Sequence, residues 1–399
     1  MMKVLSRIAA LTLILISTQA LAQNEQDEKA TIEEFKGLQF KSADSTFYIN
    51  FRFRMQNRLG LTTESGNDLS VKEFDARVRR LRLRIDGFLY DPKLAYSVQL
   101  SFSRGDQDLE NTGVANIIRD AVIFYYFTPK FYMAFGLSKL PGNRQRVNSS
   151  GQLQFAERSI VNGALTLDRD FGLKTYYTEQ IGKVVLNLKT AISTGEGRSA
   201  NTTDDGLAYT GRIEVLPFGA FASGGDYSEG DLEREKTPKI SLAGGYSFNH
   251  KAKRTGGQLG QELYNEVNLG TWIFDGLIKY NGWAYSAEFL KRDAPDPLTY
   301  DSNADLRYAF VGMGTNHQLS YLFKDNYELA GRYSFLKPSQ KIIALEPRRE
   351  MLELGASKYL QKHRIKLQLS LNYQTQNGDY NFSNQGNRWG VITQFELGI

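Results

Sequence analysis

The stretch VRRLRLRIDGFLYDPKLAYSVQLSF (78–102) alternates between apolar and polar residues on both sides of a short break. From Leu81 to Ile85 every second residue is apolar and the residues between are arginines, and the alternation resumes at Leu94. A period of two is the period of a β-strand, because successive side chains point to opposite faces. The break contains an Asp-Pro pair, in which proline fixes φ and favours a turn. The stretch therefore predicts a β-hairpin with one apolar face and one polar, arginine-rich face.

The same period recurs along the chain from residue 46 onward. It predicts 16 strands, near residues 47–58, 79–90, 94–103, 117–127, 131–138, 171–178, 184–192, 207–216, 240–248, 269–280, 283–292, 309–323, 327–335, 350–360, 365–374 and 388–399. The connections alternate between short turns, such as Asn281-Gly282, and long loops, of which 140–170 is the longest. The connection 217–238 breaks this rule, because it is long where a short turn is expected. Since the number of strands is even, both ends of the barrel sequence are expected on the same side.

The composition narrows the class of protein. The 399 residues include no cysteine and three histidines, whereas aromatic residues reach 12% and the mean hydropathy is −0.41. The lack of cysteine excludes a disulfide framework, a thiolate metal site and a cysteine nucleophile. Neither a helical membrane protein nor a disordered chain has this composition. We therefore expect a large β protein with no metal site and no other cofactor.

The N-terminus has the features of a secretory signal peptide. In residues 1–22, two basic residues precede the apolar stretch IAALTLILI (8–16), and a small-x-small triplet ends at Ala22. This order is typical of an export signal that is cleaved, here before Gln23. The following residues, 23–45, carry mixed charge, and we expect them to form a flexible periplasmic segment.

Amphipathic strands fit two architectures, a soluble β-sandwich and a transmembrane β-barrel, because water or lipid can cover the outer face. The alternation of long and short connections is typical of outer-membrane barrels. Aromatic residues next to the short turns, for example Tyr125, Phe131 and Trp283, are typical of the girdle at a membrane interface. We therefore predict an all-β fold: a 16-stranded antiparallel transmembrane β-barrel over residues 46–399, with short periplasmic turns and long extracellular loops.

Arginines line the polar face of the first two predicted strands. They are Arg52, Arg54 and Arg58 on the first strand and Arg80, Arg82 and Arg84 on the second. An arginine that faces lipid at mid-depth costs about 2–4 kcal/mol, so these side chains are expected to face the interior. A 16-stranded barrel is wide enough to hold water, and a column of guanidinium groups in it would attract anions. Alternatively, five of them pair with lumenal carboxylates such as Glu328, Glu353 and Glu396; these five are Arg52, Arg54, Arg80, Arg82 and Arg84.

The longest loop, 140–170, and its approach carry a second basic group. Its members are Lys139, Arg144, Arg146 and Arg158. If the loop folds into the barrel, it narrows the pore and brings positive charge to the constriction. If it stays outside, it is a solvated loop. The sequence leaves both alternatives open.

The residues give no support for catalysis or for nucleic-acid binding. Neither His317 nor His363 accompanies a serine in a recognisable nucleophile motif, so we expect that the protein is not an enzyme. The basic run VRRLRLR (78–84) could also belong to a nucleic-acid-binding segment. Its strict alternation with leucine, together with the export signal, argues against that interpretation.

Several segments, in the same order along the chain, carry a resemblance to a known family. They are GLQFKSADSTFYINFRFRMQNR (37–58), the arginine-rich hairpin 78–102, IRDAVIFYYF (118–127), FYMAFGLSKLPGN (131–143), QFAERSIVNGALTLDRDFGLKTYY (154–177) and ELGASKYLQKHRIKLQLSLNYQ (353–374). These segments resemble the phosphate-selective porin O and P family over most of residues 37–399. The resemblance implies a trimeric outer-membrane channel whose third long loop folds inward and whose basic side chains guide anions. The three arginines of 80–84 match the family's arginine-rich hairpin, and Arg158 lies in the matching ERS segment.

Together these observations lead to a functional hypothesis. We expect a porin in the outer membrane of a Gram-negative bacterium, through which small anions, phosphate among them, diffuse passively along an arginine-lined channel. The expected partners are these anions, outer-membrane lipid and two further copies of the chain, and no nucleic acid. The alternatives are a general, non-selective porin and a structural outer-membrane barrel with a plugged lumen.

Overall fold

The computed structural model describes residues 37–44, 46–107, 113, 115–200 and 205–399. The predicted signal peptide, 1–22, and the first part of the segment 23–45 lie outside the described residues. Within the described part of the chain, no helix has the length and apolar character needed to cross a membrane.

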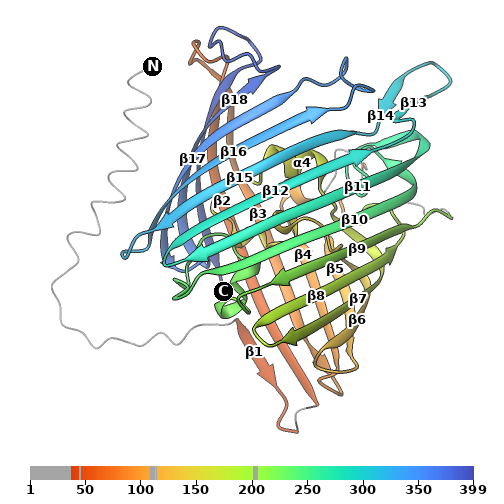
Figure 1. Ribbon diagram of the computed structural model, residues 1–399, viewed down its shortest axis with the longest axis vertical. Coiled ribbons are helices and arrows are strands. Elements are labelled where there is room, and N and C mark those ends of the chain that lie inside the picture. Colours follow the sequence, from red (N-terminus) through yellow and green to blue (C-terminus); the bar gives the residue numbers. More distant parts are fainter. Residues whose placement is uncertain (1–36, 45, 108–112, 114, 201–204) are drawn as a thin grey trace.

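The fold is a closed, antiparallel barrel of 16 strands, as predicted (Figure 1). The strands are β2 (Phe47–Thr63), β3 (Val71–Leu89), β4 (Leu94–Ser101), β5 (Ile118–Tyr126), β6 (Phe131–Lys139), β7 (Arg169–Ile181), β8 (Val184–Ser193), β9 (Ala208–Leu216), β10 (Lys239–Arg254), β11 (Glu262–Tyr280), β12 (Trp283–Asp293), β15 (Gly312–Leu322), β16 (Tyr327–Pro338), β17 (Arg349–Gln361), β18 (Ile365–Gln376) and β19 (Arg388–Gly398). Each strand pairs with the next in sequence, and β19 pairs with β2 to close the ring. Closure leaves no free edge among these strands, as a barrel in a bilayer requires.

The short turns lie at the end of the barrel where the chain enters and leaves it. Between β11 and β12, Asn281 and Gly282 adopt φ values of 48° and 90°. Two successive residues with positive φ form the tight turn that matches the twist of a hairpin. The long loops lie at the opposite end, and one of them contains the small hairpin β13 (Leu298–Tyr300) and β14 (Leu306–Tyr308).

A further strand lies outside the predicted set. Residues Leu38–Lys41 form β1, which pairs antiparallel with residues 48–51 of β2. This strand lies in the segment 23–45, for which the sequence predicted a flexible chain, so the prediction does not hold for its last part. The reason is geometric: β19 pairs with β2 only from Arg54 onward, so the first residues of β2, which pair with β3 on one side, would otherwise have an unpaired edge on the other side.

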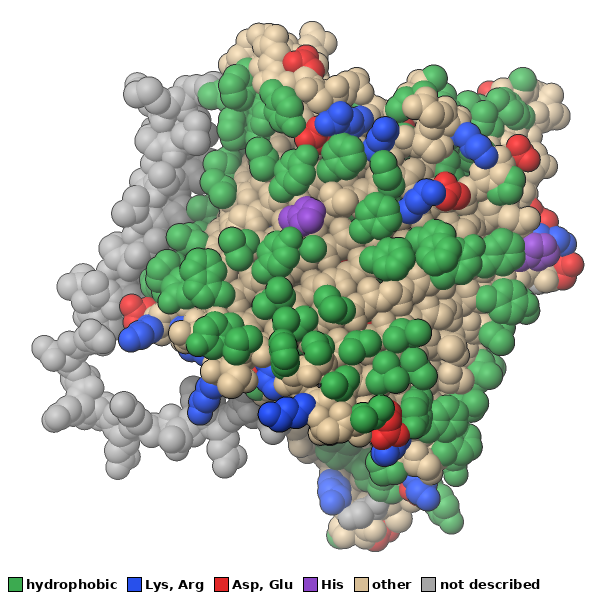
Figure 2. All heavy atoms as spheres, in the orientation of Figure 1, with side chains coloured by type: hydrophobic (Ala, Val, Ile, Leu, Met, Phe, Trp, Pro, Cys, Tyr) green, Lys and Arg blue, Asp and Glu red, His purple; other side chains and the backbone are tan. Residues whose placement is uncertain are grey.

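Side chains sort to the two faces of the wall as the alternation predicts. Apolar side chains cover the outer face in Figure 2, and most charged side chains gather near its two ends. Outward-pointing Leu354, near the middle of β17, is 67% exposed, whereas its neighbour Glu353 is buried inside. Aromatic side chains form pairs near the short turns, such as Trp283 and Tyr321 with ring centroids 4.7 Å apart. This distribution is that of a protein whose outer wall contacts lipid.

The longest loop folds into the barrel, which decides between the two alternatives that the sequence left open. It contains α3 (Arg144–Val147), η2 (Ser150–Gln152) and α4 (Ile160–Leu165). Helix α4 lies inside the ring of strands, against β12, β15 and β16 (Figure 1). Its Val161 and Leu165 are buried with Ile273, Leu290 and Leu336, which point inward from the barrel wall. These inward apolar residues give the loop a small hydrophobic core that holds it in the lumen.

The connection 217–238 also folds inward. Its helix η3 (Ala222–Tyr227) leads to Glu229, whose backbone N–H donates to the carbonyl of Gln152 in the long loop at 2.9 Å. Asp231 accepts a hydrogen bond of 2.8 Å from the backbone N–H of Gly282. The connection, here termed the insert, therefore meets the long loop inside the barrel from the opposite end. The sequence had indicated only that it is long where a short turn is expected.

A substitution on the outer wall tests the assignment of the two faces. Leu354→Arg should lower the free energy of unfolding by about 2–4 kcal/mol, because the guanidinium group would face hydrocarbon near mid-depth. Gln99→Arg, which places the same group in the lumen, should cost far less. The measurement is equilibrium unfolding by denaturant of the protein reconstituted in lipid bilayers. Equal stability of the two variants would contradict the assignment.

Candidate functional site

Two adjoining cavities follow the part of the lumen that the long loop and the insert leave open. The first, of about 450 Å³, runs along the wall from β3 to β9. The second, of about 390 Å³, lies toward the short turns and includes residues of the insert. Both are lined by Arg82, Arg84, Gln99, Ser149 and Gln152, so they share one boundary. The two cavities define the candidate pathway.

Positive charge dominates the lining of the first cavity. Nine basic side chains line it: Arg82, Arg84, Arg119, Lys139, Arg146, Arg158, Arg169, Lys189 and Arg212. Two carboxylates, those of Asp120 and Glu214, also line it. An excess of one sign of charge in a channel with low-dielectric walls raises the local concentration of ions of the opposite sign. The cavity is therefore a candidate pathway for anions.

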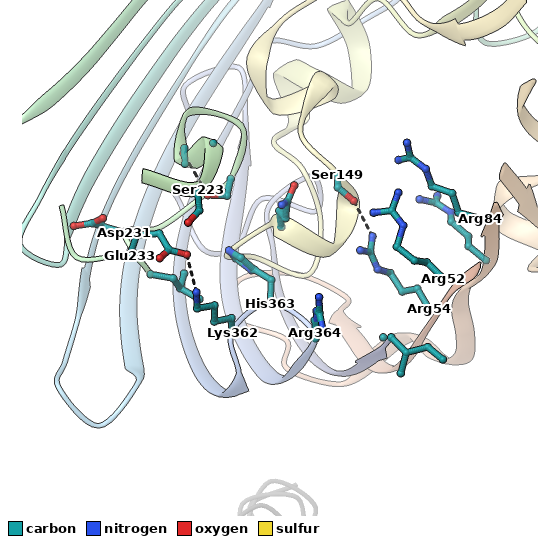
Figure 3. A pocket seen from close by; sticks show the side chains of 18 of the residues that line it. Arg52, Arg54, Arg84, Ser149, Ser223, Asp231, Glu233, Lys362, His363 and Arg364 are labelled. Carbon is teal, nitrogen blue, oxygen red and sulfur yellow. Dashed lines mark hydrogen bonds and ion pairs between the residues drawn. The ribbon is translucent and has the colours of Figure 1, made fainter. Parts of the chain in front are cut away.

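Besides Arg82, three of the predicted arginines line the second cavity. Arg52 and Arg84 are paired across β2 and β3, and both contact the carboxylate of Asp86. Their side chains remain 41% and 44% exposed. Arg54 contacts Glu396 at 3.1 Å and donates to the hydroxyl of Ser149 at 2.8 Å. Figure 3 shows the three guanidinium groups side by side at one edge of the cavity.

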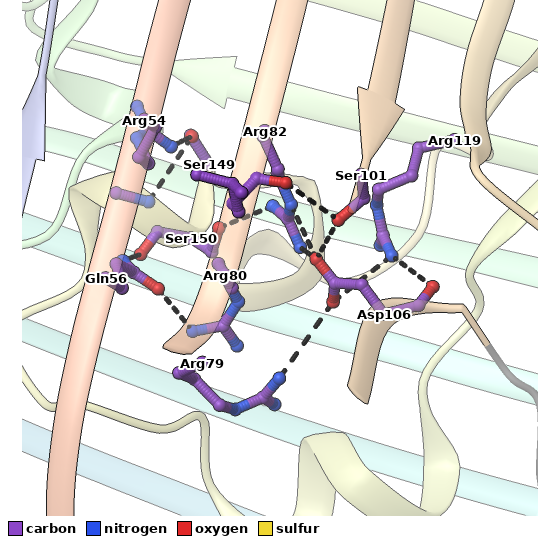
Figure 4. Close-up of polar contacts among 12 residues, drawn as sticks. Arg54, Gln56, Arg79, Arg80, Arg82, Ser101, Asp106, Arg119, Ser149 and Ser150 are labelled. Atoms are coloured by element: carbon purple, nitrogen blue, oxygen red, sulfur yellow. Dashed lines mark hydrogen bonds and ion pairs between the residues drawn. The ribbon is translucent and has the colours of Figure 1, made fainter. Parts of the chain in front are cut away.

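The other predicted arginines, Arg58, Arg80 and Arg82, are buried where the long loop covers the first strands. Arg58 and Arg80 contact Glu157 of that loop at 2.6 and 3.3 Å. Arg82 contacts Asp106, which lies in the loop between β4 and β5, at 2.5 Å (Figure 4). Arg82 also lines both cavities, whereas Arg58 and Arg80 line neither. Some arginines of this hairpin thus bind carboxylates of the loops, and others line the candidate pathway.

The two loop carboxylates are held ionised by the arginines around them. Burial raises the pKa of Glu157, but Arg80 and Arg79 outweigh it and lower that pKa well below its ordinary value. The pKa of Asp106 is lowered in the same way, because Arg82 and Arg119 outweigh the effect of burial. Both loops are therefore attached to the wall by charge-assisted hydrogen bonds, which are stronger than hydrogen bonds between neutral groups.

Of the three carboxylates that the sequence suggested as partners of the arginines, one contacts a predicted arginine and two have other partners. Glu396 does contact Arg54. Glu353 pairs with Arg332 at 2.5 Å, and Glu328 accepts a hydrogen bond from Gln154 of the long loop. The partners of the buried arginines, Glu157 and Asp106, lie in loops, and the strand pattern carried no signal for them.

The basic residues of the long loop divide into two groups. Lys139 and Arg158 line the first cavity, and their charged groups donate only to backbone carbonyls, including that of Asn148, among the hydrogen bonds of the described residues. Arg146 also lines the cavity and pairs with Asp168 at 2.6 Å. No carboxylate of the described residues therefore forms an ion pair with Lys139 or Arg158.

Arg144 belongs to the other group, because it points away from the first cavity. It is 3% exposed and contacts Asp275 of β11 at 2.9 Å. It also donates to the carbonyl of Asp226 in the insert at 2.7 Å and to the hydroxyl of Ser241 at 2.8 Å. Arg144 therefore fixes the long loop to the insert and to the far wall, a placement that differs from the constriction expected from sequence.

The sequence did not single out four other basic residues of the pathway: Arg119, Arg169, Lys189 and Arg212. Lys189 and Arg212 face each other across β8 and β9. Both occupy polar positions of an alternating strand, which was a signal for an inward side chain. Arg119 lies at 117–127, where both faces are apolar in sequence and the orientation could not be assigned. No group of side chains in the described residues has the composition of a metal site.

A closed barrel of 16 strands with a charged lumen, narrowed by an inward loop, defines an outer-membrane channel of the porin class. Residues 49–396 match the family described as phosphate-selective porin O and P, and the chain belongs to this family. The resemblance noted in the sequence is thereby confirmed. The chain has no match among curated proteins by sequence.

Solved porin structures share the fold. The anion-selective porin from Comamonas acidovorans has a TM-score of 0.55 at 12% identity, with 88% of this chain and 100% of that chain covered. Pseudomonas putida OprB has a TM-score of 0.56 at 10% identity, with 88% and 94% covered. The outer-membrane channel DcaP of Acinetobacter baumannii has a TM-score of 0.52 at 12% identity, with 90% and 99% covered. At these identities the likeness concerns the fold alone.

Removal of the Glu157 carboxylate tests the attachment of the long loop. Glu157→Gln should lower the free energy of unfolding at pH 7 by about 2 kcal/mol, because charged hydrogen bonds to arginines are lost. Since the folded-state pKa of Glu157 is lowered, its stabilising contribution is complete above pH 4.5 and is lost as the pH falls through that lowered pKa. The difference between the variant and the native protein should therefore shrink in acid.

The control for this measurement is Glu64→Gln, which removes a carboxylate that contacts Lys72 on the exterior at 3.1 Å. An exposed pair of this kind contributes little, so the change should be about 0.5 kcal/mol or less. If Glu157→Gln were as mild as this control at pH 7, the proposed attachment would be wrong.

Proposed function

We propose that this protein is an outer-membrane porin for the passive diffusion of small anions, phosphate among them. The observation that carries the proposal is the lining of the first cavity, with nine basic side chains against two carboxylates. The side chains of Arg52, Arg54 and Arg84 extend the same charge into the second cavity. An anion would move between weak contacts along this wall, since tight binding at one position would stop its passage.

The residues have different proposed roles along the pathway. Arg52, Arg54 and Arg84 attract the anion at the end near the short turns, because their guanidinium groups keep exposed surface there. Lys139 and Arg158 act where the long loop borders the first cavity, and there they donate to backbone carbonyls of that loop. Diffusion needs no chemical step, so no catalytic residue is assigned.

Export and assembly are part of the proposal. An N-terminal signal peptide cleaved between Ala22 and Gln23 would direct the chain across the inner membrane of a Gram-negative bacterium. Outer-membrane lipid would then contact the apolar outer wall. We also propose a homotrimer, which follows from the family resemblance.

Reversal potentials in a potassium chloride gradient test anion preference. The native channel should favour chloride, and the double variant Arg52→Gln, Arg84→Gln should lower the chloride-to-potassium permeability ratio by about threefold or more, as expected for the loss of charge that faces a hydrated ion. Both side chains are exposed, so the barrel should remain folded. Arg77→Gln, on the same strand but outside both cavities, is the matched control and should leave the ratio unchanged. A native channel that prefers potassium would refute the proposal.

Phosphate competition tests the finer assignment of substrate. Millimolar phosphate should reversibly reduce the chloride current through the native channel, because phosphate would occupy the same basic positions for longer than chloride does. The Arg52→Gln, Arg84→Gln variant should lose part of this effect. An equal reduction by sulfate would indicate a general anion channel. A lack of conductance steps in planar bilayers would instead indicate a plugged structural barrel.

A further inference from the structure

The insert places a tyrosine into the anion pathway, beside one of its two carboxylates. Tyr227 lies at the end of η3 and lines the first cavity together with Glu214, Lys189 and Arg212. Its hydroxyl lies 2.6 Å from Oε1 and 2.5 Å from Oε2 of Glu214. The insert connects β9 to β10 at the end of the barrel that carries the short turns. A short turn at this place would be too short to bring a side chain to Glu214 of β9.

Glu214 is fully occupied by donors in this arrangement. Arg212 Nε donates to Oε1 at 2.7 Å, Lys189 Nζ donates to Oε2 at 2.7 Å, and Asn187 Nδ2 lies 3.4 Å from Oε2. The Tyr227 hydroxyl is the remaining donor, and the Glu214 side chain is 1% exposed. A carboxylate whose lone pairs are satisfied in this way presents no acceptor to the water of the pathway.

The tyrosine also contacts the cations around the carboxylate. Lys189 Nζ lies 4.6 Å from the centroid of the Tyr227 ring, and Arg144 Cζ lies 5.7 Å from it. Cations are attracted to the face of an aromatic ring at such distances. Burial and the Glu214 carboxylate raise the pKa of Tyr227 well above its ordinary value, so the hydroxyl keeps its proton as a donor.

Contacts on both sides of Tyr227 hold it in this position. The carbonyl of Asp226 accepts a hydrogen bond of 2.7 Å from Arg144, and the N–H of Glu229 donates to the carbonyl of Gln152 at 2.9 Å. The insert thus delivers the tyrosine to the pathway from a position fixed by the long loop. The backbone on both sides of Tyr227 is therefore held in place while its hydroxyl contacts Glu214.

We propose that Tyr227 is a selectivity-determining residue of the channel, because it caps Glu214 and keeps that negative charge away from passing anions. This inference rests on the anion pathway proposed above. In a lining of nine basic groups and two carboxylates, one uncapped carboxylate next to Lys189 would both repel anions and attract cations. The role of the insert is then to supply this cap.

The experiment compares chloride-to-potassium permeability ratios of four channels in planar bilayers. Tyr227→Ala should lower the ratio about threefold, the order expected for one unit charge that faces a hydrated ion at a distance of about 6 Å. Tyr227→Phe keeps the ring but removes the donor, and should lower the ratio by a smaller factor. The double variant Tyr227→Ala, Glu214→Gln should return the ratio to the native value or above it, because the carboxylate that the tyrosine caps is absent.

The chain offers a matched control outside the lumen. Tyr177 donates to Glu179 at 2.6 Å, and Lys130 contacts the same carboxylate at 2.6 Å. This trio repeats the chemistry of Tyr227, Glu214 and Lys189 without lining either cavity. Tyr177→Ala should therefore leave the permeability ratio unchanged.

The outcomes separate this inference from the proposed function. An unchanged ratio in both Tyr227 variants would overturn the inference, and so would an equal loss with and without the Glu214→Gln change. Tyr227→Phe keeps the test decisive if the alanine variant does not assemble. A native channel that prefers potassium would refute the anion pathway itself. Because this measurement uses only the native protein, it is independent of the results for the Tyr227 variants.

Discussion

A guanidinium group cannot face hydrocarbon without a cost of about 2–4 kcal/mol, and the first two barrel strands carry six of them at alternate positions. This constraint decides which face of β2 and β3 points into the barrel. Because paired residues on adjacent strands point to the same face, the register of pairing then decides which face of the neighbouring strands points inward. A slip of one residue would turn every side chain of a strand to the other face. The same alternation that buries Arg80 and Arg82 therefore places leucines of these strands against lipid.

The arginines then require partners, and the loops supply them. Three guanidinium groups contact Glu157, and Asp106 contacts Arg82 and Arg119. These contacts hold the inward loop against one wall, while α4 packs on inward apolar residues of the opposite wall. The lumen is thus divided. Helix α4 occupies the lumen next to β12, β15 and β16, and the first cavity is bounded by the basic wall from β3 to β9.

Two segments that enter from opposite ends meet inside this barrel. Arg144 of the long loop binds both the insert and Asp275 of the wall, so one side chain links the two segments to each other and to the barrel. Membership of the phosphate-selective porin O and P family accounts for the barrel as a whole. The net charge that the pathway presents to an ion depends on each carboxylate of its lining, because a carboxylate that is buried and paired with cations is less accessible to the ion.

The sequence alone determined the strands, their faces, the inward arginines and the family, because the period of two and the order of motifs are local properties of the chain. It left open the course of 140–170, did not identify Glu157 and Asp106 as the partners of Arg58, Arg80 and Arg82, and missed Arg119. The contacts of the arginines depend on the inward fold of the long loop, which brings together residues that lie far apart in sequence: Glu157 contacts Arg58 across 99 positions. Only the tertiary structure decided which charges face water, because pairing and burial depend on neighbours that alternation along one strand cannot reveal.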